Sequence, residues 1–310
     1  MGTTLNIATP ADFDLPRDVC SYGYFVLAPN RWDVQSQSLT RPLNLHDGPA
    51  KASITQPAKG RLRAGFDRPL SRSEQAQARA KIARMLRLDE AEDHTKAFHR
   101  ADPRWKRSGR SRLFRSPTLF EDIVKTVTSC NVTWPGTVNM NTQLVRHLGR
   151  KGCFPTPVRL ARTRPGTLRG RCRVGYRDQR LIELANLFHT GHIDEHWLQS
   201  PATPDDDVFD FLKTLPGIGP YAAGNILMLL GRYSRLAIDT ETIRHGKAVL
   251  GFTGSDQQIT TQLNAHYEPF GPFKFKSYWF ELWAHYETKQ GPSHLWKREE
   301  TATAFTANNL

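Results

Sequence analysis

The sequence has little cysteine and no long apolar run. Its four cysteines, Cys20, Cys130, Cys153 and Cys172, form no Cys-x-x-Cys pair and lack the histidine spacing typical of zinc sites. The N-terminus lacks the basic-then-apolar pattern of a secretory signal, which argues against disulfides. No segment approaches the roughly 18 uninterrupted apolar residues of a membrane span. These absences predict a reduced, intracellular protein that does not enter a membrane.

Acidic residues are also scarce. Lys and Arg number 43 against 30 Asp and Glu, so the 310 residues carry a net charge of +13. Two stretches, 104–115 and 159–177, contain many arginines and no acid. Arginine outnumbers lysine in both, as is common where a protein holds phosphates. Such runs can also be plain solvated loops, but the charge favours a polyanionic partner.

The hydrophobic pattern divides the chain into three parts. Residues 1–70 hold short β-branched and aromatic runs that end at Pro and Gly, which predicts a small antiparallel sheet. From 71 to 296 the apolar spacing is mostly helical, and 297–310 form a polar tail that we expect to fray. The predicted fold class is therefore α+β, with a small N-terminal β domain and a mostly helical body.

One helix is predicted within 116–134, SPTLFEDIVKTVTSCNVTW. Thr118 and Glu121 have the spacing of a capping box, in which each side chain bonds the backbone of the other residue. The apolar residues behind them recur at helical spacing, as Phe120, Ile123, Val124 and Val127. This helix should be buried along one face.

A glycine hairpin is predicted at 215–231, LPGIGPYAAGNILMLLG. The preceding helix should begin with Thr203 as N-cap and Pro204 at its first position. Apolar residues recur at helical spacing on both sides of the turn, at 208, 211, 212 and 215 and again at 223, 226, 227 and 230. Gly217 and Gly219 permit a tight turn and leave backbone amides open to an anion such as a phosphate.

Asp239 follows the hairpin in the segment LAIDTETIRHGK. The apolar lead-in would place this carboxylate at a helix start, where an aspartate usually serves as N-cap. It can also face a cavity and stabilise positive charge or activate water. The two roles are compatible, because one oxygen can cap the helix while the other reacts.

Together these segments resemble a known family. LPGIGPYAAGNILMLLG followed by AIDTETIRH resembles the helix-hairpin-helix–Gly/Pro–Asp (HhH-GPD) motif of DNA glycosylases related to endonuclease III, 8-oxoguanine DNA glycosylase and 3-methyladenine DNA glycosylase II. DFDLPRDVCSYGYFVL looks like the start of the β domain of the latter two, FEDIVKTVTSCNVTW like their first core helix and VGYR like their lesion-side loop. The likeness covers most of residues 12–285. Polymerases and ligases share the hairpin, so the aspartate carries the specificity.

The resemblance implies roles for the hairpin and the aspartate. The amides of Gly217 and Gly219 would grip a DNA phosphate, and Asp239 would be the catalytic carboxylate. A monovalent cation is often held there by backbone carbonyls, which would be those of Lys213, Leu215 and Ile218. No cofactor is required, and because no cysteine follows Cys172, no iron–sulfur cluster is expected.

Tyr221 bears on the chemistry. Bifunctional members carry a lysine at this position, which forms a Schiff base with the sugar, and tyrosine cannot do so. The resemblance therefore implies a monofunctional enzyme in which water attacks. Tyrosine here also occurs in members that act on thymine or uracil mispaired with guanine. Tyr221 can equally be a packing residue at a helix start.

The resemblance also implies residues that handle a flipped base. Asn131 and Tyr176-Arg177 would fill the gap in the duplex, with Tyr176 as wedge and Arg177 bonded to the unpaired base. The alternatives are a helix-capping Asn131 and a core Tyr176. The resemblance places six aromatic residues in segments that the family folds around its pocket, and we expect about two of them to face the base and the others to belong to the core. They are Tyr22, Tyr24, Trp134, Tyr221, Trp279 and Trp283, and the base-pocket candidates among them are Tyr221, Trp134, Trp279 and Trp283.

These observations favour a monofunctional DNA glycosylase of base excision repair. An alkylated purine is the preferred substrate, because a cationic base needs an aromatic pocket more than specific hydrogen bonds. Gly136 also stands where 8-oxoguanine enzymes carry a second cytosine-reading arginine. Excision of 8-oxoguanine, excision of mispaired thymine or uracil, and non-catalytic lesion binding remain alternatives. We expect a monomer that binds double-stranded DNA containing a damaged base, in the cytoplasm or nucleoid of a prokaryote or the nucleus of a eukaryote.

Overall fold

The structure is a computed structural model that describes residues 2–91, 93–297 and 301. The chain forms two compact units, each built from separated segments. Unit 1 comprises Met1–Glu92, Arg112–Ile193 and Gln290–Leu310, and unit 2 comprises Asp93–Ser111 and Asp194–Lys289. In the described part of the chain, no helix is both long and apolar enough to cross a membrane.

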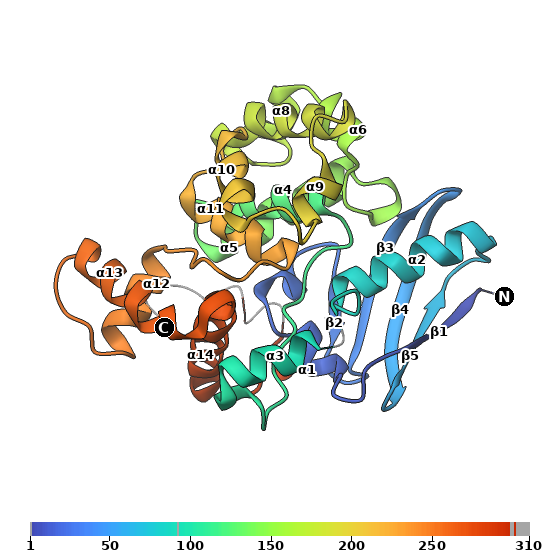
Figure 1. Cartoon of the computed structure of the whole chain (residues 1–310). Coiled ribbons are helices and arrows are strands. Elements are labelled where there is room, and N and C mark those ends of the chain that lie inside the picture. The colour runs from blue at the N-terminus through green and yellow to red at the C-terminus, as the bar shows by residue number, and fades with distance from the viewer. Residues whose placement is uncertain (1, 92, 298–300, 302–310) are drawn as a thin grey trace. The chain divides into compact units, whose positions relative to one another are not determined.

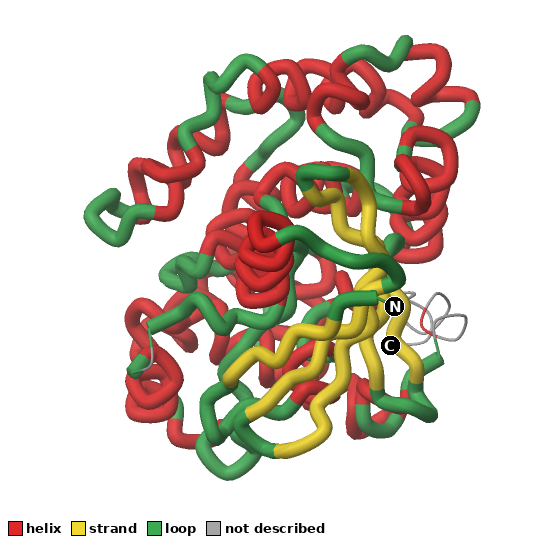
Figure 2. The backbone as a smooth tube through the Cα atoms, turned by 90° about the vertical axis from the view of Figure 1, so that its right-hand side faces the viewer, coloured by secondary structure: helices red, strands yellow, loops and turns green. Residues whose placement is uncertain are grey.

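Unit 1 contains a five-stranded antiparallel sheet with the order β1-β5-β4-β3-β2 (Figure 2). Every second residue is buried from 39 to 45 in β3 and from 48 to 54 in β4, as expected for a sheet with one face on the core. The sheet lies within the predicted region 1–70. Its strands are β1 (Thr4–Ala8), β2 (Arg31–Asp33), β3 (Ser38–Leu45), β4 (Gly48–Ala58) and β5 (Arg61–Phe66).

Some helices of unit 1 pack on the sheet, and others form a separate helical group. α2 packs against β1 and β3 and crosses the sheet (Figure 1), and α4, α5, α6, α7 and α8 pack among themselves. The helices are α1 (Leu15–Val19), α2 (Arg72–Met85), α4 (Leu119–Ser129), α5 (Trp134–Leu148), α6 (Pro157–Ala161), α7 (Pro165–Gly170) and α8 (Asp178–His189).

One predicted capping interaction is only half present in α4. The side chain of Thr118 caps the helix and accepts the amide of Glu121 at 3.3 Å. The carboxylate of Glu121 does not return to the backbone, because it is buried against Arg41 and Lys125 at 2.9 and 2.7 Å. A pair of buried cations holds a carboxylate more strongly than one backbone amide does.

Unit 2 is helical. α10 packs against α11, and α12 against α13. The prediction for the start of α10 was wrong by one residue, because Pro204 occupies the N-cap position and the hydroxyl of Thr203 donates to the carbonyl of Trp197. The helices are α3 (His94–Ala101), α9 (Glu195–Gln199), α10 (Asp205–Thr214), α11 (Pro220–Leu230), α12 (Thr240–Ala248), α13 (Asp256–Tyr267) and α14 (Lys274–Gln290).

The predicted helical body, 71–296, is thus distributed over both units, and the sheet shares unit 1 with α4 to α8. The pattern of residue types shows where helices begin and end, but it does not show which of them pack together. Most of the predicted polar tail, 297–310, lies outside the described residues.

Candidate active site

The predicted hairpin between two helices is present in unit 2. α10 ends at Thr214, and α11 begins at Pro220 after a turn in which Ile218 donates its amide to the carbonyl of Leu215 at 3.1 Å. Gly217 has φ = 78°, in the left-handed region that favours glycine. Gly219 has open space where a side chain would stand. A large group can therefore approach the backbone closely at Gly219.

The amides of this turn point to anion binding. Over the described residues, the amides of Gly217 and Gly219 donate to no protein acceptor. Both precede the N-terminus of the 11-residue helix α11, where the helix dipole favours a negative charge. Two available amides at a helix N-terminus are suited to hold a phosphate.

The three predicted cation ligands lie in the same turn. Lys213 is the penultimate residue of α10, and Leu215 and Ile218 follow it. The carbonyl of Leu215 accepts one amide, which leaves its second lone pair for a cation. A set of neutral backbone oxygens fits a monovalent ion, so the residues present are compatible with the predicted cation.

Asp239 is the N-cap of α12, as the sequence predicts. Its Oδ1 accepts the amide and the hydroxyl of Thr242, each at 2.8 Å, and its Oδ2 takes part in neither bond. Burial raises the pKa of this half-buried carboxyl above its usual value, although the bonds from Thr242 oppose the shift. Thr242 therefore holds one oxygen of the carboxylate and not the other.

A glycine in α11 sets the path of the chain toward Asp239. A Cβ added to Gly224 would lie 3.2 Å from the carbonyl oxygen of Leu236 and 3.3 Å from the Cα of Ala237. The helix that follows the hairpin therefore packs backbone-to-backbone against the segment that carries the carboxylate. Such close contact limits how far Asp239 can move relative to the hairpin.

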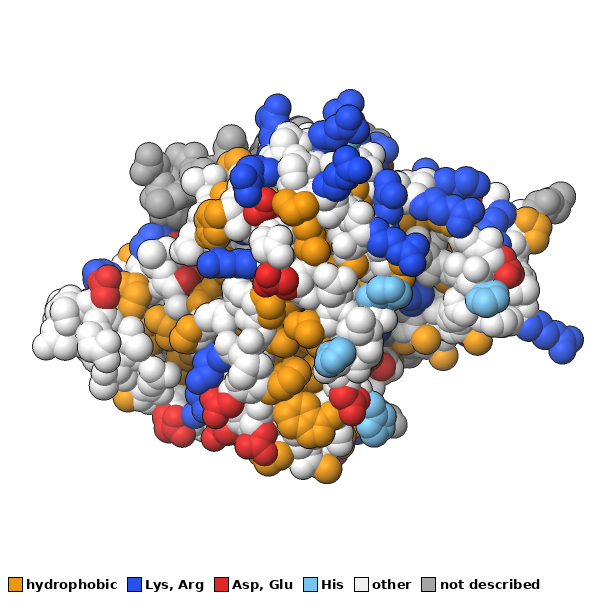
Figure 3. All heavy atoms as spheres, turned by 90° about the horizontal axis from the view of Figure 1, so that it is seen from above, with side chains coloured by type: hydrophobic (Ala, Val, Ile, Leu, Met, Phe, Trp, Pro, Cys, Tyr) orange, Lys and Arg blue, Asp and Glu red, His pale blue; other side chains and the backbone are white. Residues whose placement is uncertain are grey.

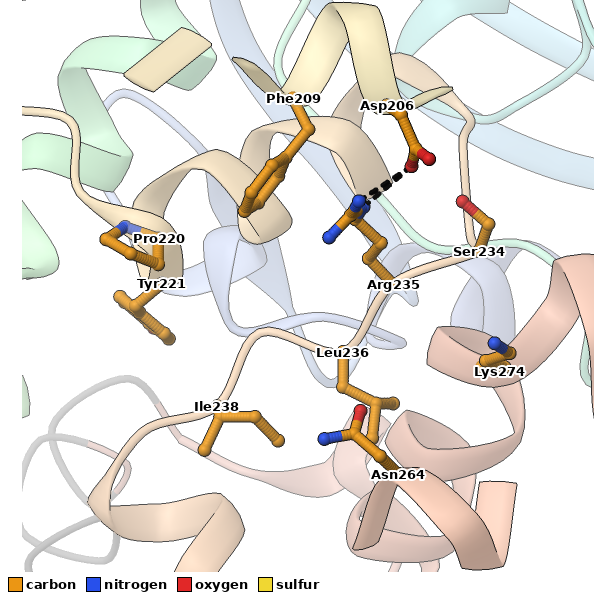
Figure 4. A pocket seen from close by; sticks show the side chains of 10 residues that line it. All are labelled: Asp206, Phe209, Pro220, Tyr221, Ser234, Arg235, Leu236, Ile238, Asn264 and Lys274. Carbon is orange, nitrogen blue, oxygen red and sulfur yellow. Dashed lines mark hydrogen bonds and ion pairs between the residues drawn. The ribbon is translucent and has the colours of Figure 1, made fainter. Parts of the chain in front are cut away.

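Tyr221 lines a pocket of about 430 Å³ within unit 2 (Figure 4). Ile238, the neighbour of Asp239, lines the same pocket, so the start of α11 and the segment before α12 share one wall. On the opposite side the guanidinium of Arg235 stacks on Phe209 at 4.3 Å and pairs with Asp206 at 2.7 Å. The pocket combines aromatic and charged groups.

The other predicted base-pocket aromatics differ in exposure. Trp279 is half-buried on α14, where it stacks on Trp283 at 5.5 Å. Trp283 is only 2% exposed and also contacts Tyr286, so it has the position of a core residue and not the predicted role against a base. Trp134 is half-buried in unit 1, where its ring packs beside Gly23.

Unit 1 brings Asn131 to Arg177, the neighbour of Tyr176, although 46 residues separate the two. Asn131 is exposed between α4 and α5 with φ = 50°, and Tyr176 is 53% exposed. Both side chains are therefore open to solvent, and the wedge role of Tyr176 stays a prediction.

Arg177 departs from its predicted role. Its side chain is buried and donates to the carbonyls of Val127, Cys130 and Asn131, with the distances to Val127 and Asn131 being 3.1 and 3.3 Å. The guanidinium also lies 4.5 Å from the ring centroid of Tyr176. Arg177 is therefore a clamp that supports Tyr176 and the loop before α5, and its donors are occupied by the protein.

The two basic stretches have different positions. In 104–115, four arginines pair with carboxylates of their own unit, as Arg104–Asp102, Arg110–Glu287, Arg112–Asp12 and Arg115–Asp89. In 159–177, six arginines are exposed, namely Arg159, Arg162, Arg164, Arg169, Arg171 and Arg173. Of these six, Arg169 has a carboxylate partner in the described structure, Asp178 at 2.7 Å. Figure 3 shows several Lys and Arg side chains close together in the upper half of the face in view, with others scattered over the rest of it.

Solved structures with the same architecture are DNA glycosylases. MBOgg1 in complex with a low-affinity DNA ligand has a TM-score of 0.67 at 18% identity, covering 92% of this chain and 97% of that one. The 3-methyladenine DNA glycosylase from Archaeoglobus fulgidus has 0.67 at 14% identity, covering 91% and 98%. The chain has the HhH-GPD DNA glycosylase fold. The 8-oxoguanine glycosylase/lyase of Clostridium acetobutylicum, with a TM-score of 0.65 at 15% identity over 90% and 97%, has it as well.

No family model matches the chain, and no curated protein matches it by sequence. The likeness of this HhH-GPD fold to known structures therefore lies in the path of the backbone.

Sequence reasoning overlooked two residues around the carboxylate. Thr242 stands three positions after Asp239, and this spacing of a capping box was the available signal. Tyr278, on α14, carries no local signal because 36 residues separate it from Thr242.

Proposed function

We propose that this protein is a monofunctional DNA glycosylase that removes a damaged base from double-stranded DNA. The observation that carries the proposal is the arrangement in unit 2. A hairpin with two available glycine amides is joined through tightly packed α11 to a carboxylate that is fixed by one oxygen only. The first part suits a DNA phosphate and the second a positive charge that develops in the reaction.

The chemistry follows from the carboxylate. The target nucleotide leaves the base stack, and the bond between base and sugar C1′ breaks with its electron pair departing on the base. The positive charge left on the sugar is stabilised by ionised Asp239. Water then adds to C1′ and loses a proton, so the products are a free base and an abasic site. Tyr221 has no amine to attack C1′, so no covalent intermediate forms through it.

An alkylated purine is the substrate class that we favour. A cationic base already has a good leaving group, and exposed or half-buried aromatics such as Tyr221 and Trp279 can stack on it. A neutral oxidised purine needs polar groups that recognise its altered edge. Gly136 is part of α5 and offers no side chain for reading an opposite cytosine.

A lesion panel tests this proposal. Duplexes that each contain one defined lesion are incubated with excess enzyme, and abasic sites are counted. We expect release of 3-methyladenine or 7-methylguanine in preference to 8-oxoguanine and to thymine or uracil opposite guanine. Release of 8-oxoguanine alone would overturn the substrate class, and release from no duplex would leave a lesion-binding protein without catalysis.

The same panel tests the absence of lyase chemistry. Strands should break only after alkali or heat, and borohydride should trap no protein–DNA adduct, because an imine requires an amine at the sugar. The matched positive control is Tyr221→Lys, which places an amine on the same wall of the pocket. An adduct trapped with the unaltered protein would show that a different amine attacks.

Removing exposed arginines from 159–177 should weaken DNA binding in a salt-dependent way. We expect the double variant Arg162→Gln/Arg171→Gln to reduce the slope of log K against log salt by up to about 2, since each phosphate contact contributes roughly 0.9. Duplex affinity is measured by fluorescence anisotropy between low and high salt. The control Arg61→Gln/Arg63→Gln removes equal charge from exposed positions of β5. Equal slopes for both variants would mean that only net charge matters.

A further inference from the structure

The hydroxyl of Thr242 stands at the centre of four polar contacts. Its Oγ1 lies 2.8 Å from Asp239 Oδ1, 2.9 Å from the hydroxyl of Tyr278, 3.1 Å from the carbonyl of Ala237 and 3.3 Å from the amide of Asp239. Thr242 itself is fully buried, and Tyr278 is 3% exposed. Water therefore has little part in deciding which of these contacts form.

Counting protons gives the direction of the hydrogen bonds. A threonine hydroxyl has one proton to donate and two lone pairs that accept. Asp239 Oδ1 and the Ala237 carbonyl only accept, and an ionised carboxylate attracts the proton more strongly than a neutral carbonyl does. The two lone pairs are then left for the amide of Asp239 and the hydroxyl of Tyr278. Tyr278 must donate, because the single proton of Thr242 is already in use.

We propose that Tyr278 and Thr242 are positioning residues that keep Asp239 ionised and oriented, through the chain Tyr278 O–H to Thr242 O–H to Asp239 Oδ1. This inference rests on the proposed function, since it assigns the two residues to the same reaction. Hydrogen bonds in such a chain polarise one another, so the bond to the carboxylate is strengthened by the tyrosine behind it. Oδ2 stays outside this hydrogen-bond chain.

The hydrogen bonds of this chain depend on whether Asp239 is protonated. When the carboxyl is neutral, the pull on the proton of Thr242 disappears, and the Ala237 carbonyl at 3.1 Å becomes a competing acceptor. Burial raises the pKa of Tyr278 well above its usual value, so this hydroxyl stays a donor throughout the neutral range. The chain is therefore complete only while Asp239 carries its charge.

Other ionisable groups surround this hydrogen-bond chain on α12, α13 and α14, and from α13 the ring of Tyr267 packs on Tyr278 with 5.7 Å between the ring centroids. The negative charge of Glu241 on α12 disfavours ionisation of Asp239. The carboxylate of Glu241 accepts hydrogen bonds from Arg244 and from the hydroxyl of Tyr286. His245 packs its ring against Tyr278 with 5.8 Å between the ring centroids, and it bonds to Glu281 at 2.9 Å. These neighbours stay in place when the hydroxyl of Tyr278 is removed, so their effects cancel in a comparison of variants.

The test is the pH profile of Tyr278→Phe under single turnover. We expect the excision rate to fall about fivefold at neutral pH, the order of one lost hydrogen bond, with duplex affinity within about twofold. The acid limb should move up by about half a pH unit, because the less stabilised carboxylate takes up its proton earlier. Thr242→Val should move the acid limb to a still higher pH, and Thr242→Ser should keep the acid limb of the unaltered protein. The control Thr128→Val, matched to Thr242→Val, removes a buried hydroxyl of unit 1 that donates to the carbonyl of Val124 at 3.0 Å, and it should leave the acid limb unchanged.

A second measurement separates this inference from the proposed function. The Asp239 carboxyl is titrated by carbon NMR in the unaltered protein and in Tyr278→Phe, with Asp239→Asn to identify the signal. A higher pKa of Asp239 in Tyr278→Phe supports the hydrogen-bond chain even if no base is released from any duplex, in which case only the proposed function fails. Equal pKa values of Asp239 in the two proteins, or an unchanged acid limb in an active enzyme, would overturn the proposed hydrogen-bond chain.

Discussion

Asp239→Asn is expected to lower the single-turnover rate of base excision at least about a hundredfold, while duplex affinity stays nearly the same. Asparagine has the same shape, and its side-chain oxygen can still accept the amide and hydroxyl of Thr242, so α12 should begin as before. The substitution removes only the negative charge. The loss therefore measures how far the reaction depends on a charge opposite the sugar.

The matched control for this prediction is Asp256→Asn. Asp256 lies in the first turn of the neighbouring helix α13, where its exposed carboxylate pairs with Lys247 at 2.8 Å. The same chemical change there should leave excision within about twofold, since an exposed ion pair contributes little. Unchanged excision by Asp239→Asn would remove this carboxylate from the mechanism.

Glu121→Gln is expected to lower the free energy of unfolding by about 3–5 kcal/mol, the typical result of removing one partner from a buried ion pair. Glu121 is 2% exposed and lies between Arg41, also 2% exposed, and Lys125, which is fully buried. Glutamine fills the same space but leaves two buried cations without a counter-charge. Urea unfolding followed by circular dichroism measures the loss.

The control is Glu183→Gln on the exposed side of α8, which should change stability by less than about 0.5 kcal/mol. A similarly small change for Glu121→Gln would show that water or structural relaxation compensates the two cations.

The same carboxylate predicts an acid limit to stability. Burial alone would raise the pKa of Glu121, but the attraction of Arg41 and Lys125 and their hydrogen bonds lower it to about 2. The folded pKa lies below the ordinary value of 4.5, so the contribution is complete above about pH 4.5 and is lost as the pH falls toward 2. In Glu121→Gln this part of the pH dependence should be absent.

Local features were well predicted by the sequence. The hairpin, the sheet within 1–70 and the N-cap position of Asp239 all depend on residues a few positions apart. Apolar residues at helical spacing, a glycine at a left-handed turn and an aspartate after an apolar segment act within one or two helical turns. Such signals can be read without knowing what the rest of the chain does.

Pairs that are distant in sequence could not be predicted in the same way. The stretch 104–115 has the composition of a DNA-binding segment, yet most of its arginines neutralise internal carboxylates. Arg177 matches a base-reading position, but the carbonyls of α4 and its following loop satisfy its donors. An arginine has the same sequence signature in either role, because its charge does not reveal which acceptor the fold brings to it.

By itself, then, the sequence determined the local elements of the candidate site, namely a glycine hairpin with available amides and an aspartate that caps the next helix. Only the tertiary structure decided which charged side chains pair within the protein and which hydroxyl groups form the hydrogen-bond chain to the carboxylate of Asp239. Arg41 and Glu121 are 80 residues apart, and Thr242 and Tyr278 are 36 apart. Contacts of this kind form because packing buries both partners together, and burial makes an unpaired charge or hydroxyl too costly to leave unmatched.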